Sequence, residues 1–205
     1  MATLLRLDTS LFSEQGVSTQ LSEKLVSNLR EENPTLKVIH RNFSEQAIPH
    51  LDGERLQALM TPIEKRNESQ QAKVDFSDQL IAELQEADTL VIGLPMYNFS
   101  IPSMLKAWFD HIARAGTTFK YTSTGSEGLL GDKKVFLVTT RGGIHKDQAS
   151  DTQIPFVKTF LGFIGLNNID VIYAEGLNMG DDMRNTAIES AREAIDALTA
   201  TAATV

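Results

Sequence analysis

Hydrophobic residues along this chain fall into two patterns that alternate from one end to the other. The first is a short, continuous run of aliphatic and β-branched residues, which is typical of a strand buried on both faces. The second is a longer segment with apolar residues every three or four positions, which is typical of an amphipathic helix. Runs of the first kind predict five strands, over residues 3–8, 36–41, 89–95, 134–140 and 169–176.

Helical segments separate the predicted strands. This alternation predicts a parallel sheet with right-handed crossovers and helices on both faces. Five such strands indicate an α/β, flavodoxin-like, doubly wound sheet of order 2-1-3-4-5, in a single domain over residues 1–205. We expect the helices over about 18–32, 73–87, 102–115, 152–164 and 182–199.

Residues 44–72 do not follow this alternation. The stretch is polar and is interrupted by Pro49 and Pro62, which predicts an excursion with short helices. An active-site lid and a decoration of the fold are both compatible with this pattern.

Composition excludes several classes of function. Of the 205 residues, 41% are hydrophobic and 22% are charged, as in ordinary globular proteins, and the formal charge is −8. This acidity disfavours nucleic acid and anionic membranes as partners. The N-terminus lacks an apolar signal segment and no run approaches ~18 apolar residues, so we expect a cytoplasmic protein.

Two absences narrow the chemistry further. There is no cysteine, which excludes thiolate chemistry and disulfides. The four histidines are scattered without the spacing of metal ligands, so no metal is expected. Redox chemistry, if present, has to come from a cofactor.

In a sheet of this kind the ligand lies beyond the carboxyl ends of the central strands. The first loop there, residues 8–19, leads into a helix N-terminus, which can bind an anion through its free N–H groups. Ser10 and Ser18 add hydroxyls, and Gly16 lets the backbone approach a phosphate. Alternatively, Ser18 is only the N-cap of the helix.

The second loop, "PMYNF" at residues 95–99, is unusually apolar for a turn. A flat, ring-shaped ligand lying on Met96, Tyr97 and Phe99 would shield them from water, and Asn98 would meet its polar edge. Alternatively, these side chains pack against the following helix.

The third loop, "TTRGGIHKD" at residues 139–147, brings glycines and a histidine to the same edge. Gly142 and Gly143 free the backbone to surround a ligand edge, while Thr140 and His145 provide hydrogen-bond donors. A simple glycine turn with an exposed histidine is the alternative. A phosphate site, a surface for an aromatic tricycle and a hydrogen-bonding edge together match FMN.

Three stretches resemble the FMN-dependent NADH-azoreductases, relatives of the NAD(P)H:quinone oxidoreductases. They are "PMYNFSIPSMLKAWFDHIARAGTTFKYT", "TRGGIHKD", and "TFLGFIG" followed by "AEG". The resemblance implies a flavodoxin-like homodimer with one FMN per subunit near the dimer interface. The cofactor-binding residues that it implies are Ser10, Gly16, Val17, Ser18, Pro95, Met96, Tyr97, Asn98, Phe99, Thr140, Arg141, Gly142, Gly143 and His145.

The chain departs from the family pattern at two places. Gly16 and Val17 stand where the family commonly has Ser-Gln, so two side-chain contacts to the phosphate are missing and backbone N–H groups have to compensate. Thr140 replaces a serine but keeps the hydroxyl. Weaker FMN binding with unchanged chemistry is expected.

The resemblance also implies the reaction. NADH or NADPH would reduce the flavin, and quinones or aromatic azo compounds would reoxidise it in a ping-pong cycle, twice for each azo bond. His145 and Asn98 are the expected catalytic residues, placed to stabilise charge at the edge of the flavin. Phe119, Tyr121, Phe160 and Phe163 are the candidate walls of the substrate slot, with core packing as the alternative.

Two other functions are compatible with parts of the pattern. A flavodoxin-like electron carrier without nicotinamide activity would also be acidic and bind FMN. A serine hydrolase would use Ser10 as nucleophile, but no histidine follows His145 to complete its triad.

Overall fold

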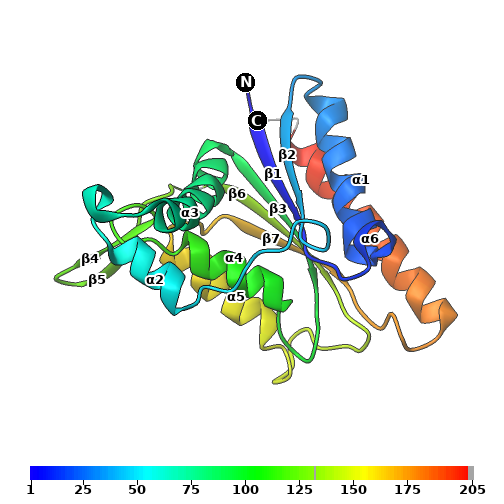
Figure 1. Ribbon diagram of the computed structural model, residues 1–205. Helices are drawn as coiled ribbons and strands as arrows, with labels where there is room; N and C mark the ends of the chain where they lie inside the picture. Colours follow the sequence, from blue (N-terminus) through cyan, green and yellow to red (C-terminus); the bar gives the residue numbers. More distant parts are fainter. Residues whose placement is uncertain (132, 203–205) are drawn as a thin grey trace.

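The sheet has five parallel strands in the order β2-β1-β3-β6-β7 (Figure 1). The computed structural model describes residues 1–131 and 133–202. Every residue of the central strand β1 is buried, as the continuous apolar runs predict. The five strands are β1 (Thr3–Asp8), β2 (Lys37–Asn42), β3 (Thr89–Pro95), β6 (Lys134–Thr140) and β7 (Ile169–Ala174).

The strand numbering of the prediction has to be corrected, because the chain contains two further strands. β4 (Phe119–Thr122) and β5 (Gly125–Gly128) pair as an antiparallel hairpin outside the main sheet. The predicted order 2-1-3-4-5 therefore differs from the observed order 2-1-3-6-7. The hairpin was missed because "GSEG" at β5 is largely exposed and contains no β-branched or aromatic residue.

Helices cover both faces of the sheet (Figure 1). One face carries α1 (Val17–Glu32) and α6 (Asp181–Ala202), and the other carries α3 (Glu68–Glu86), α4 (Ser103–Ile112) and α5 (Gln153–Phe163). Each face has its own core. Within the described residues, no helix is long and apolar enough to cross a membrane.

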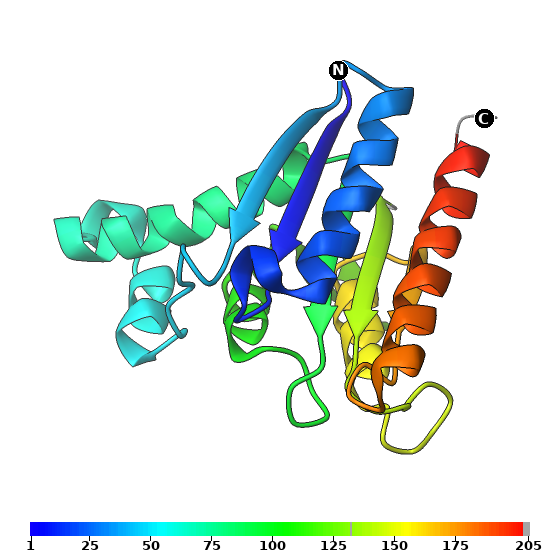
Figure 2. The same cartoon turned by 90° about the vertical axis from the view of Figure 1, so that its right-hand side faces the viewer.

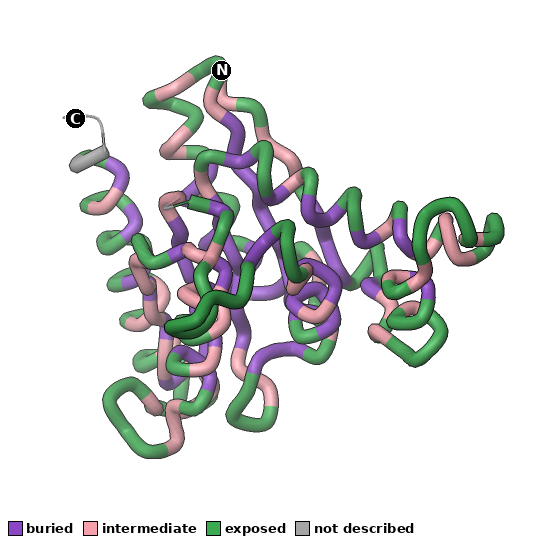
Figure 3. Tube along the Cα trace, turned by 90° about the vertical axis from the view of Figure 1, so that its left-hand side faces the viewer, coloured by how far each residue is buried: buried purple, intermediate pink, exposed green. Residues whose placement is uncertain are grey.

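Neighbouring residues of β1 show how the two cores are filled. Leu4 packs with Leu21 of α1, whereas Leu5 packs in the core that contains Leu80 and Trp108 on the opposite face. Figure 3 shows these buried strands between more exposed helices. Strands that are buried on both faces explain why the sequence shows continuous apolar runs rather than alternation.

The polar excursion contains α2 (Gly53–Met60) and a short 3-10 helix, η2 (Ile63–Lys65). α3 begins at Glu68, earlier than the predicted residue 73, because Asn67 and Gln70 form a reciprocal capping box. The apolar periodicity that defined the predicted helix begins only at the second turn.

His111 of α4 anchors this excursion to the body of the protein. Its buried ring lies between Ser77 of α3, with Nδ1 to Oγ at 2.7 Å, and the carbonyl of Pro49, with Nε2 to O at 2.9 Å. A carbonyl oxygen can only accept, so Nε2 carries the proton and Nδ1 accepts from the serine. Burial lowers the pKa of His111 from its ordinary 6.5, which favours the neutral ring.

A close backbone contact fixes the β4–β5 hairpin against the end of α5. A Cβ atom on Gly128 would lie 2.0 Å from the backbone nitrogen of Gly165, so the two backbones touch. The N–H of Leu130 also donates to the carbonyl of Ile164. Gly165, the last residue of "TFLGFIG", thus allows the hairpin to approach.

The carboxyl ends of the strands converge on one edge of the sheet. In Figure 2 the strands point downward, and the loops that follow β3 and β6 extend below them. This edge is where the sequence predicts the ligand.

The His111 contacts lead to a pH-dependent stability. Because the folded pKa lies below the unfolded value, only the unfolded chain takes up the proton as the pH falls below 6.5. We expect the free energy of unfolding, measured in urea at pH 7.5 and 5.5, to fall over this interval, and to fall less in His111→Gln. Equal pH dependence in both proteins would refute this role for His111.

Candidate cofactor site

A cavity of about 450 Å³ lies at the carboxyl edge, between the ends of the central strands and the start of α1. Its size is within the range of small-molecule sites. Ten of the predicted cofactor-binding residues line it: Ser10, Gly16, Val17, Ser18, Pro95, Met96, Tyr97, Thr140, Arg141 and Gly142.

Five lining residues were not foreseen from the sequence. Two come from the short segment that precedes α1, and three from the loop after β7 and the first turn of α6. For the three residues after β7, the sequence offered only their position as a signal. The fifth strand ends at the same edge of the sheet as the strands that lead into the three predicted loops. These residues are Phe12, Gln15, Leu177, Asn178 and Arg184.

The end of the cavity at α1 is suited to an anion. α1 begins at Val17 with Gly16 as its N-cap, so no side chain caps the first N–H groups of the helix. Ser18 lies inside the first turn rather than at the N-cap, which corrects that alternative. Its Oγ is buried and has no hydrogen-bond partner within the described residues. Free backbone N–H groups and such a hydroxyl are the donors that an anion site would need.

The loop after β3 is a tight, strained turn. Tyr97 and Ser100 exchange two backbone hydrogen bonds of 3.0 Å, and both residues between them have positive φ, 50° at Asn98 and 65° at Phe99. Such conformations are costly for residues other than glycine and persist only where surrounding contacts enforce them. Phe99 is 57% exposed, so it does not pack against the following helix.

Gln153, at the start of α5, supplies contacts that enforce this turn. Its buried amide donates to the carbonyl of Pro95 at 2.9 Å and to that of Ser100 at 3.4 Å. Its oxygen accepts from the hydroxyl of Thr139 at 2.9 Å. One buried side chain therefore ties both ends of the turn to β6.

Arg141 stabilises the third loop through a side chain that is buried in the protein. Its guanidinium is fully buried and pairs with Asp151 at 2.8 Å and with Glu175 at 3.0 Å. Glu175 also accepts the N–H groups of His145 and Lys146, both at 2.9 Å. The guanidinium of Arg141 is therefore committed to two carboxylates.

The loop after β7 runs alongside the glycines of the third loop. Backbone hydrogen bonds join Leu177 to Arg141 at 3.1 Å and Asn178 to Gly142 at 3.0 Å. A Cβ atom on Gly142 would lie 2.5 Å from Nδ2 of Asn178. A side chain at position 142 would therefore require the amide of Asn178 to move.

Four predicted cofactor-binding residues lie at the rim and do not line this cavity. Asn98 lines an adjoining cavity of about 530 Å³, which shares Met96 and Tyr97 with the first. The rings of Phe99 and His145 meet edge to face at 5.6 Å, and Nδ1 of His145 lies 2.9 Å from Oγ of Ser150. His145 thus links the second and third loops over Gly143.

The four aromatic residues predicted for the substrate slot meet one another but not this cavity. Phe119 packs against Phe163, with ring centroids 4.3 Å apart, and Tyr121 lies edge-on to Phe119. Phe160 stacks on Phe109 of the core at 4.1 Å, whereas the side chain of Tyr121 is exposed. Within one subunit, Phe160 therefore has the core-packing role left open from the sequence.

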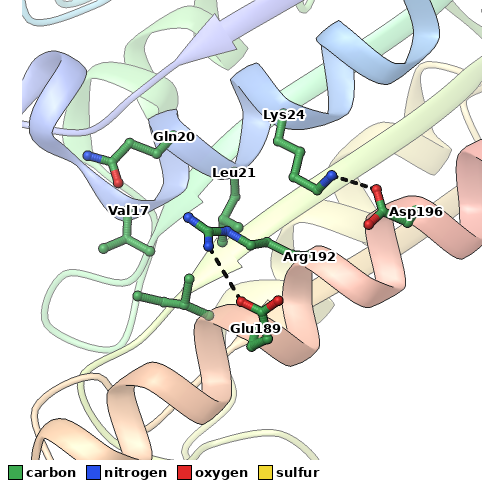
Figure 4. Close-up of a pocket in the computed structure, with 8 residues that line it drawn as sticks. Val17, Gln20, Leu21, Lys24, Glu189, Arg192 and Asp196 are labelled. Carbon is green, nitrogen blue, oxygen red and sulfur yellow. Dashed lines mark hydrogen bonds and ion pairs between the residues drawn. The ribbon is translucent and has the colours of Figure 1, made fainter.

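A separate groove of about 330 Å³ runs between α1 and α6 (Figure 4). Its charges are paired: Lys24 with Asp196 at 2.5 Å, and Arg192 with Glu189 at 3.4 Å. The Lys24–Asp196 pair crosses from one helix to the other. Val17 lines both this groove and the cofactor cavity.

Comparisons with known proteins agree with this geometry. A family model described as flavodoxin-like fold matches residues 2–198. An FMN-dependent NADH:quinone oxidoreductase from Cellvibrio japonicus is 53% identical over 96% of this chain and 98% of its own. An FMN-dependent NADH-azoreductase from Bacillus anthracis, solved in complex with FMN, superposes with a TM-score of 0.87 at 25% identity, covering 97% of this chain and 100% of that one. A second azoreductase structure from Bacillus anthracis gives 0.89 at 27% identity, covering 97% and 99%.

The buried ion pairs predict a graded loss of stability at Glu175. We expect Glu175→Ala to lower the free energy of unfolding by about 3 kcal/mol, because it removes a partner of a buried guanidinium. Glu175→Gln retains an acceptor for the two N–H groups and should cost about 1 kcal/mol. Urea unfolding measures both. Glu189 is exposed, so Glu189→Ala is the control and should change the free energy of unfolding by less than about 0.5 kcal/mol. An equally small change in Glu175→Ala would contradict a stabilising role for the pair between Arg141 and Glu175.

Proposed function

The chain belongs to the flavodoxin-like fold family, and on that premise we propose that it is an FMN-dependent NADH:quinone oxidoreductase that also cleaves aromatic azo compounds. The observation that carries the proposal is the cavity in which the predicted loops meet at the carboxyl edge. Relatives with this named activity match nearly the whole chain.

The residues of the cavity fit FMN at both ends. The uncapped start of α1 and the unpaired hydroxyl of Ser18 would hold the phosphate. Met96 and Tyr97 would lie against the flat ring system, and the hydroxyl of Tyr97, which accepts from the N–H of Leu11 at 3.1 Å, keeps its ring in place. Gly142 leaves the backbone of the third loop accessible to the polar edge.

Bound FMN would supply the hydride chemistry that the side chains of this protein lack. The protein's own part is to position and polarise. Gln153 and the ion pairs of Arg141 fix the second and third loops, so that N–H groups not already used within these loops would be preorganised toward developing negative charge. Asn98 and His145 remain the proposed catalytic residues, placed at the rim of the cavity where a substrate would enter.

In this proposal the substrate slot forms only in a homodimer. Phe119, Tyr121 and Phe163 lie away from their own cavity, so they would serve as slot walls only in a homodimer, across the interface. Exposure of Tyr121, at 77%, supports a surface role for the hairpin. We further propose a cytoplasmic, single-domain enzyme that takes NADH or NADPH as donor and flat quinones or azo compounds as acceptors.

Steady-state turnover tests the function. We expect purified protein supplemented with FMN to oxidise NADH when a quinone is present, with the parallel-line kinetics of a ping-pong cycle, and to do the same more slowly with an azo dye. Protein without FMN should be inactive. Tight FMN binding without NADH oxidation would instead indicate the electron carrier, and a lack of any FMN binding would refute both functions.

A further inference from the structure

We propose that Arg184 binds the phosphate of the flavin and makes the site selective for FMN over riboflavin. This inference rests on the proposed function, which requires FMN, and adds a residue that neither the motifs nor the resemblance pointed to. It follows from the position of the side chain, from the charges around it, and from what the start of α1 lacks.

Arg184 lines the same cavity as Gly16, Val17 and Ser18. It lies in the first turn of α6, is only partly exposed, and is fixed by a backbone hydrogen bond of 3.0 Å to Gly180. Among the residues that the structure describes, its guanidinium makes one long hydrogen bond, from Nη1 to the carbonyl of Leu177 at 3.4 Å. No carboxylate of the described residues pairs with it, so its remaining N–H groups are available to an anion.

The charges around the cavity distinguish Arg184 from the other arginine that lines it. Arg141 is the other cationic residue that lines the cavity, and two carboxylates already neutralise its guanidinium. Arg184 is therefore the cation free to compensate a phosphate dianion. A guanidinium presents several N–H donors in a planar fork that suits phosphate oxygens.

The first turn of α1 shows why this chain needs such a residue. Gly16 and Val17 offer no side-chain donor toward an anion. A Cβ atom on Gly16 would lie only 2.3 Å from Oγ of Ser10, so a serine could not replace this glycine without displacing Ser10. Donors from α1 are thus limited to backbone N–H groups and Ser18, and positive charge has to come from another element.

α6 is held in place to provide that charge before any ligand arrives. The ion pair between Lys24 and Asp196, seen in Figure 4, joins α6 to α1, and apolar contacts between the two helices form part of a core. The backbone of Arg184 is therefore positioned by packing. Only its side chain has to be ordered on binding, which limits the entropic cost.

Binding of two flavins separates this role from a structural one. We expect Arg184→Gln to weaken FMN binding by about 10- to 100-fold, measured by quenching of flavin fluorescence. Riboflavin, which lacks the phosphate, should bind the variant and the original protein within about twofold. Arg184→Lys keeps a charge and should recover part of the FMN affinity. Added salt should weaken FMN binding more in the original protein than in Arg184→Gln.

Arg192→Gln is the matched control, because Arg192 lies on the same helix but in the separate groove, paired with Glu189. It should leave both affinities unchanged. The inference is overturned if Arg184→Gln leaves FMN binding intact, or if it weakens FMN and riboflavin equally. If the original protein binds neither flavin, the proposed function fails together with this inference. If the original protein is active and Arg184→Gln binds FMN with unaltered affinity, this inference alone is overturned.

Discussion

Parallel pairing of β3 with β6 is the constraint on which the site depends. Their register places Pro95 opposite Thr140, so both strands end at the same level, and the N–H of Met96 donates to the carbonyl of Thr140 at 2.9 Å. The aromatic turn and the glycine loop therefore begin side by side. The pairing of β6 with β7, which sets Thr140 opposite Ala174, adds the next loop at the same edge. A shift of either register would separate these loops.

Buried polar groups then fix the conformations of the loops that follow β3 and β6. Gln153 holds both ends of the strained turn, and Arg141, with Asp151 and Glu175, holds the glycine loop. Such buried networks stabilise little when compared with apolar packing, but removal of one member is costly. Their contribution here is to make one loop conformation much more stable than the alternatives. The most conspicuous cation of the motif, Arg141, thus acts as a brace and leaves the anion to other groups.

The sequence predicted the parallel sheet well, because strands buried on both faces leave continuous apolar runs. It also located the three loops, since topology places their motifs at one edge. It did not reveal the exposed hairpin around "GSEG", which is placed by contacts distant in sequence, such as that between Gly128 and Gly165. Nor did it identify Glu175, Asn178 or Arg184, because no local pattern distinguishes a polar residue that turns toward a neighbouring loop. The direction of the Arg141 side chain also could not be predicted from the sequence, because it depends on two carboxylates that lie outside the motif.

Hydrogen–deuterium exchange with and without FMN shows whether these loops form the cofactor site. Amides that contact the flavin, or lie in segments it orders, should exchange more slowly. We predict slower exchange in residues 16–19, 96–100 and 141–145, and no change in the amides that line the groove between α1 and α6, apart from Val17. Slowed exchange confined to other segments, with these three unaffected, would contradict this prediction.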